Sequence, residues 1–180
     1  MTSNEIGMIL SLFGMAVTAL SFQTEKKRAF LILQSVGNLF YLFSYVFNGG
    51  DIGIFINVIY VIRNLLFAFV LSEENKKHKG VGAISVGSAL LITYGVFFMI
   101  SPLTLAERLW NAVPIIGSLF GTVAVTQKNI DRVRLWKYGD SVSWLAYNLH
   151  IGTGALGGII GEVINLASLT LGIIRRKKNK

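Results

Sequence analysis

Seven stretches of mostly apolar residues follow one another along the chain, separated by short polar links. They run from Ile6 to Phe22, Phe30 to Phe47, Ile52 to Leu71, Val81 to Ile100, Leu109 to Val125, Val133 to His150 and Ala155 to Ile174. A helix needs about 20 apolar residues to cross a hydrocarbon core of about 30 Å. The runs lack the strict alternation of barrel strands, and helices satisfy their own backbone hydrogen bonds in lipid. The pattern predicts an all-α integral membrane protein with seven transmembrane helices.

The second half of this pattern repeats the first. SLFG at 11–14 recurs at 118–121, QSVGNLFYLF at 34–43 pairs with DSVSWLAYNL at 140–149, and NVI at 57–59 pairs with EVI at 162–164. An offset that stays between 105 and 107 across three segments indicates an internal duplication. Three crossings reverse the chain, so the fourth segment, which has no Asp, Glu, Lys, Arg or His within 81–100, restores the direction of the second copy.

These observations predict a 3+1+3 arrangement of the helices. We expect two parallel three-helix bundles at residues 5–72 and 107–175, a linker helix at 80–101, and a basic cytoplasmic tail at 176–180. Repeats of this kind place a substrate site near the middle of the membrane, between the two halves.

Basic residues gather in alternate links, which predicts the orientation of the chain. They follow the first segment, the third segment and the fifth segment and end the chain, whereas the other three links contain a single base, Arg108. Cytoplasmic loops collect Lys and Arg, so the N-terminus is expected outside and the C-terminus inside. The net charge of +8 is then explained by topology and contact with anionic lipids, and we expect no binding of nucleic acid.

Composition supports a membrane protein and narrows the chemistry. Of the 180 residues, 53% are hydrophobic and 14% are charged, which is too apolar for an ordinary soluble domain. With no cysteine in the chain, disulfides and thiolate metal sites are excluded, and we expect neither a metal nor a cofactor.

Polar residues lie in stripes on the helices that would face each other. On the second segment, polar positions recur every three or four residues, which is one face of a helix, and the sixth segment has a corresponding stripe. We expect these stripes, with polar positions of the third and seventh segments, to line a cavity, although polar residues between membrane helices also serve as packing contacts. The candidate solute-binding residues are Gln34, Asn38, Tyr41, Asn57, Tyr60, Asn64, Trp144, Tyr147, Asn148, Glu162 and Asn165.

Arg63, Asp140 and Glu162 are charged residues that fall well inside predicted helices. A charge at bilayer depth costs at least about 2.5 kcal/mol, so these side chains are expected to pair or to meet water. Arg63 and Glu162 form either a structural ion pair or part of the site, and Asp140 or Glu162 either recognises the solute or carries a proton. Lys137 lies close enough to the inner surface to reach it, and we expect no role for it.

Pro114 interrupts the fifth segment. It removes a backbone hydrogen bond and favours a kink, which is either a hinge for alternating access or a static bend. The only other proline, Pro102, lies in a predicted outer loop.

Several of these stretches resemble a known family. VPIIGS at 113–118, WLAYN at 144–148, Arg63 and GGIIGEVINLASLTLGIIRR at 157–176 are similar to the bacterial inner-membrane YgjV-like family over nearly the whole chain. The layout resembles more distantly the PQ-loop superfamily of 3+1+3 carriers, which includes SWEET sugar carriers and Pnu-type carriers of vitamin precursors. The resemblance implies a multi-pass protein of the bacterial inner membrane that moves a small neutral or cationic solute. Gly7 stands where the first bundle of those carriers has a proline, and no Pro-Gln pair occurs.

We therefore expect a transporter, most simply a facilitated-diffusion uniporter. Its solute would be a vitamin precursor, a nucleoside or a sugar, bound between two rocking bundles. A non-transporting scaffold or lipid-binding protein is an alternative, and an intramembrane enzyme is a weaker one. His150 and Asp140 are ten residues apart on one helix, about 15 Å, and no HExxH or GxSxG motif occurs, so we expect no catalysis. The partners would be membrane lipids and the solute, with homo-oligomerisation possible.

Overall fold

The computed structural model describes residues 2–48, 51–70, 76–100, 104–151 and 156–178, and this part of the chain is helical apart from short links. The elements are α1 (Ser3–Ser21), α2 (Lys27–Asn48), α3 (Asp51–Leu65), a π-helical segment (Leu66–Val70), α4 (Lys76–Ile100), α5 (Leu105–Thr126), α6 (Ile130–Ile151) and α7 (Leu156–Lys178). Each predicted segment corresponds to one of the seven α-helices. Pro102 and the predicted boundary residues 71, 72, 101, 155, 179 and 180 lie outside the described residues.

Within the described residues, 6 helices are long and apolar enough to span a membrane, and α6 is the exception among the helices. Its sequence contains Arg134, Lys137 and Asp140, which lower its hydropathy. These three side chains are buried in the protein. These three charges of α6 therefore face neighbouring helices, whereas Arg132 at the start of the helix is exposed.

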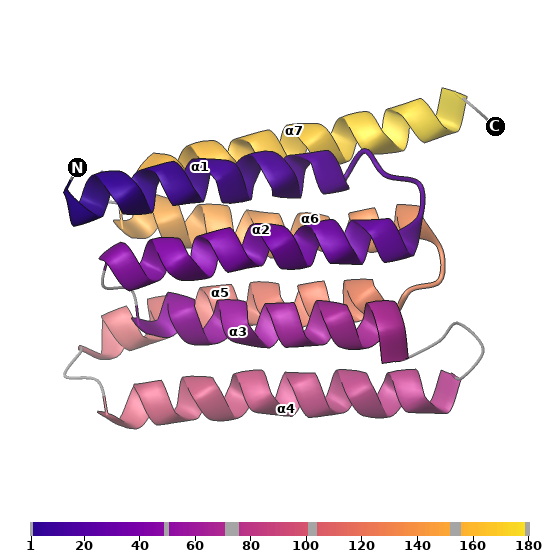
Figure 1. Ribbon diagram of the computed structural model, residues 1–180. Coiled ribbons are helices and arrows are strands. Elements are labelled where there is room, and N and C mark those ends of the chain that lie inside the picture. Colours follow the sequence, from indigo (N-terminus) through magenta and orange to yellow (C-terminus); the bar gives the residue numbers. More distant parts are fainter. Residues whose placement is uncertain (1, 49–50, 71–75, 101–103, 152–155, 179–180) are drawn as a thin grey trace.

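The helices lie side by side along one common direction, and the chain passes back and forth between the two ends (Figure 1). α2 contacts both α1 and α3, and α6 contacts both α5 and α7. The two groups meet where α1 contacts α7 and where α3 contacts α5, while α4 lies against α5 and α3. The same order of contacts thus occurs in both copies of the sequence repeat.

Glycines of the repeated SLFG motif explain the close approach of neighbouring helices. A Cβ added at Gly14 would lie 3.0 Å from the carbonyl oxygen of Gly37 on α2. A Cβ added at Gly121 would lie 2.7 Å from Oδ2 of Asp140 on α6. A side chain at either position would have to displace these neighbours, so the motif lies at the α1–α2 contact in one copy and at the α5–α6 contact in the other.

The basic link between α1 and α2, the basic start of α4, the link between α5 and α6 and the basic end of α7 lie at one end of the bundle, and the start of α1 lies at the other (Figure 1). The main hydrophobic cluster lies near this basic end and is formed by side chains from most helices. Its buried members are Phe22, Phe30, Leu31, Phe67, Ala124, Val125, Ile130, Val133 and Leu169. Nearer the middle of the helices, the side chains in the interior are mostly polar or aromatic.

Candidate functional site

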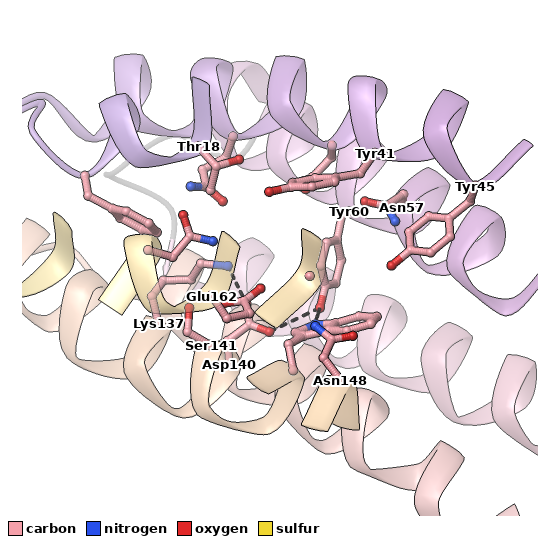
Figure 2. Close-up of a pocket in the computed structure, with 16 residues that line it drawn as sticks. Thr18, Tyr41, Tyr45, Asn57, Tyr60, Lys137, Asp140, Ser141, Asn148 and Glu162 are labelled. Atoms are coloured by element: carbon pink, nitrogen blue, oxygen red, sulfur yellow. Dashed lines mark hydrogen bonds and ion pairs between the residues drawn. The ribbon is translucent and has the colours of Figure 1, made fainter. Parts of the chain in front are cut away.

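A cavity of about 80 Å³ lies between the two groups of helices, near the middle of their length. Side chains from α1, α2 and α3 face side chains from α6 and α7 across it (Figure 2). The lining residues are Thr18, Phe22, Gln34, Asn38, Tyr41, Tyr45, Asn57, Tyr60, Lys137, Asp140, Ser141, Trp144, Asn148, Gly158, Glu162 and Asn165. Most are polar or aromatic, so the interior of this apolar protein is hydrophilic at its centre.

Most of the residues that the sequence nominated as solute-binding line this cavity. The exceptions are Asn64 and Tyr147. Asn64 is buried, and its Oδ1 accepts a hydrogen bond of 3.1 Å from Nε of Arg63. The hydroxyl of Tyr147 donates to Oδ1 of Asn111 on α5 at 2.9 Å. Both side chains therefore make hydrogen bonds next to the cavity and do not line it.

An ion pair lies on the α6 side of the cavity. Nζ of Lys137 donates to Oδ2 of Asp140, one helical turn further on, and both side chains are almost fully buried. We expected Lys137 to extend toward the membrane surface, but its burial and its partner show that it points inward. A carboxylate at this depth needs such a partner, because an uncompensated buried charge is costly.

Tyr60 connects the two groups of helices at the same level. Its hydroxyl lies 2.6 Å from Oγ of Ser118 and donates to Oδ1 of Asp140 at 3.3 Å. Nε1 of Trp144 donates to the same hydroxyl at 3.2 Å. One phenol from α3 thus orients an indole and a carboxylate of α6, which fixes one wall of the cavity (Figure 2).

Arg63 lies behind this wall, with only 1% of its surface exposed. Its guanidinium carbon is 4.3 Å from the ring centre of Tyr60, and Nη1 is 3.4 Å from Oγ1 of Thr122 on α5. A Cβ at Gly121 would meet both Nη1 of Arg63 and Oδ2 of Asp140, at 3.1 and 2.7 Å. Arg63 therefore places a second positive charge beside the carboxylate of Asp140.

Four polar atoms of the lining have no hydrogen-bond partner within the described part of the chain, although they are buried. They are Oγ1 of Thr18, Nδ2 of Asn38, Oε2 of Glu162 and Oδ1 of Asn165. A buried polar atom without a partner costs about 1–3 kcal/mol. Such atoms are rare in proteins, so a cluster around one cavity indicates that water or another polar molecule occupies it.

Some lining residues were not predicted from the sequence, and two of them carried a readable signal. Ser141 and Lys137 precede Trp144 by three and seven residues, which puts them on the same face of α6. Thr18 gave a weaker signal, as one of the small buried residues of an otherwise apolar α1.

Pro114 is buried inside α5, and the helix continues on both sides of it. Its carbonyl oxygen accepts a hydrogen bond of 2.7 Å from Oγ of Ser118. Pro114 is not among the residues that line the cavity. A hinge at this residue stays a prediction.

Long apolar helices that enclose a polar cavity define a polytopic α-helical membrane protein. The model of the Imp-YgjV family, described as a bacterial inner membrane protein, matches residues 5–180. The chain belongs to this family and is a protein of the bacterial inner membrane. No curated protein and no solved structure matches the chain.

Proposed function

We propose that the protein carries a small polar solute across the inner membrane by facilitated diffusion. In this proposal α1–α3 and α5–α7 are two parallel bundles, α4 is the linker between them, and the basic end of the molecule faces the cytoplasm. The observation that carries the proposal is the polar cavity between the two groups of helices. Burying so many polar side chains at this depth is costly, and four of their polar atoms make no hydrogen bond within the described residues that would offset this cost.

The lining supplies the contacts that such a solute needs. Trp144 and Tyr41 offer aromatic faces on which a flat ring or a sugar stacks. Asn38, Asn148 and Asn165 offer both donors and acceptors for the polar edge of the solute. These contacts require no chemical change of the solute, so the proposal is a carrier and not an enzyme.

Release on the cytoplasmic side requires the groups of helices to separate at the basic end. There, Nη2 of Arg134 on α6 donates to the carbonyl oxygens of Phe22 and Thr24 at 2.9 and 3.0 Å. Nε2 of Gln23 donates to Oγ of Ser168 on α7 at 2.7 Å. These bonds join the end of α1 to the second group, beside Phe22 in the cavity wall. We propose that they form a cytoplasmic gate, which opens when the bundles rock about the bound solute.

Exchange across liposomes containing the purified protein tests the proposal. We expect saturable counterflow of at least one labelled solute from a panel of nucleosides, sugars, vitamin precursors and smaller amides and polyols. Trp144→Ala should reduce this counterflow by about tenfold or more, which corresponds to about 1.4 kcal/mol of lost binding. Trp110→Ala is the matched control, because Trp110 stacks on His150 at 4.1 Å and is not among the lining residues.

The alternatives give different results in the same experiment. A scaffold or lipid-binding protein produces no counterflow of any solute, and an enzyme returns a chemically altered one. Equal counterflow in wild type, Trp144→Ala and Asn148→Ala would show that transport does not use this cavity.

A further inference from the structure

We propose that the solute is compact, carries no net charge, and presents more hydrogen-bond donors than acceptors. This inference rests on the carrier function proposed above, and it narrows the class of solute. Three features of the cavity support it: the balance of charges around it, the kind of unpartnered atoms that line it, and its size.

Charges at the level of the cavity balance without a solute. Lys137 is ion-paired with Asp140, and the guanidinium of Arg63 lies beside the same carboxylate. Glu162 is the remaining acid of the lining. With the carboxyl group of Glu162 ionised, two bases oppose two acids in a setting where an uncompensated charge is expensive. A cation or an anion would disturb this balance, whereas a neutral solute preserves it.

The lining atoms that have no partner favour a solute with several hydrogen-bond donors. Oε2 of Glu162 and Oδ1 of Asn165 are acceptors, and both come from α7. Nδ2 of Asn38 is a donor from α2, and Oγ1 of Thr18 on α1 can act in either sense. A solute with N–H or O–H groups toward α7 and one acceptor toward Asn38 would satisfy all of them. It would also connect the two groups of helices, as a carrier requires.

The cavity sets an upper limit on size. Its volume of about 80 Å³ exceeds the ~10–15 Å³ that holds one water molecule. Pockets for drug-sized ligands occupy about 300–1,000 Å³. A molecule of a few heavy atoms, such as an amide, a urea or a short polyol, fits this space, and a nucleoside does not.

Urea and guanidinium provide a matched pair of probes, because both are planar, have four heavy atoms and differ by one charge. In liposomes containing the wild-type protein, we expect saturable counterflow of labelled urea and at least tenfold slower counterflow of guanidinium. An imposed membrane potential should leave urea exchange unchanged. Acetamide and glycerol, which are also small and uncharged, should compete with urea, and acetate should not.

Two variants test the residues. Glu162→Gln removes an acceptor and one negative charge, and Asn165→Leu removes an acceptor while leaving the charges intact. Each should lower urea counterflow at least tenfold. The control is Glu107→Gln, which makes the same chemical change in the first turn of α5, where Gln preserves the N-terminal cap. Its urea counterflow should match wild type, and size-exclusion profiles should show that all three variants are folded.

Several outcomes would overturn this inference while leaving the carrier intact. Guanidinium or acetate exchanging as fast as urea would exclude a charge-balanced site. Exchange of nucleosides or sugars without exchange of urea, acetamide or glycerol would exclude a compact solute. Failure of every solute in both panels would instead remove the proposed carrier function itself.

Discussion

α2 and α6 hold equivalent central places, since each contacts both other helices of its group. Each also presents to the cavity a stripe with spacings of four, three and four residues, which is Gln34, Asn38, Tyr41 and Tyr45 in α2 and Lys137, Ser141, Trp144 and Asn148 in α6. The sequence repeat aligns Gln34 with Asp140, so the stripe of α6 begins three residues earlier than the repeat implies. Relative to the alignment of the repeat, the side of α6 that lines the cavity is therefore rotated by about 60° about the helix axis from the side of α2 that does so.

The two stripes also differ in charge. The stripe of α2 is neutral, and α2 is apolar enough to span a membrane. The face of α6 carries Lys137 and Asp140, which stabilise each other inside the protein. The order of helix contacts is thus the same in both groups, whereas only the cavity face of α6 carries charged side chains. Contacts with neighbouring helices should therefore contribute more to the stability of α6 than to the stability of α2.

The largest expected effect comes from removing the carboxylate of α6. Asp140→Leu leaves Lys137 buried without its partner and should destabilise the protein by about 3–5 kcal/mol. Gln34→Leu, at the aligned position of α2, breaks the 2.6 Å bond from Nε2 of Gln34 to Oγ of Ser21 and should cost about 1–2 kcal/mol. Unfolding of detergent-purified protein in denaturant, followed by circular dichroism, measures both.

The double variant Lys137→Met/Asp140→Leu is the control for this prediction. Replacing both members of a buried ion pair by apolar residues is often neutral or stabilising. The double variant should recover most of the stability that Asp140→Leu loses. If it is as unstable as the single variant, the loss comes from packing and not from the unpaired charge.

Most helices of this protein were predictable from hydropathy, because their apolar runs are long and end at polar or small residues, whereas α6 is too polar to qualify as a span by hydropathy alone. Much of the cavity was predictable too, because a stripe at helical spacing has to avoid lipid and therefore meets another stripe. Gln34, Asn38 and Tyr41 were found in this way.

What the sequence did not predict depends on how α6 is rotated about its own axis. Alignment with α2 put Tyr147 in the site, and closeness to the inner surface gave Lys137 no role, whereas the structure turns Tyr147 toward Asn111 and Lys137 toward Asp140. Rotation is set by packing against α5 and α7, and one sequence gives no direct measure of it. The contacts of Arg63 with α5 were not predictable either, because they join helices of different copies of the repeat and depend on how the two groups pack.

The second prediction compares the arginines at matching positions of the repeat. Arg134 is 2% exposed, and its guanidinium donates to carbonyl oxygens at the end of α1. Arg28 is exposed, with its guanidinium carbon 4.6 Å from the ring centre of Phe69. Arg134→Ala should cost about 2–3 kcal/mol, because hydrogen bonds of a buried charge are lost. Arg28→Ala should cost about 0.5–1 kcal/mol, the contribution of an exposed cation–π contact.

Denaturant midpoints of the two arginine variants measure this difference. Arg134→Lys keeps the charge but not the planar set of donors that reaches the carbonyl oxygens of Phe22 and Thr24. It should recover only part of the stability lost in Arg134→Ala. Full recovery by lysine would show that charge alone is needed, and equal losses at Arg28 and Arg134 would remove the difference between the two copies at this end.

The smallest expected effect lies in the repeated SLFG motif, where Ser11 and Ser118 occupy the same position. Oγ of Ser118 is buried and contacts both the hydroxyl of Tyr60 and the carbonyl oxygen of Pro114, at 2.6 and 2.7 Å. Oγ of Ser11 donates to the carbonyl oxygen of Met8 within its own helix, at 2.7 Å. Ser118→Ala should cost about 1 kcal/mol, because the phenol of Tyr60 loses a partner.

Ser11→Ala should cost less than about 0.5 kcal/mol, as for most substitutions away from a buried network. The same unfolding measurement resolves the two values if both serine variants are compared with wild type in one detergent. Tyr60→Phe combined with Ser118→Ala tests the coupling, because the two losses should be less than additive if the hydroxyls depend on each other. Additive losses would mean that Ser118 acts on Pro114 alone and not through the hydroxyl of Tyr60 in the wall of the cavity.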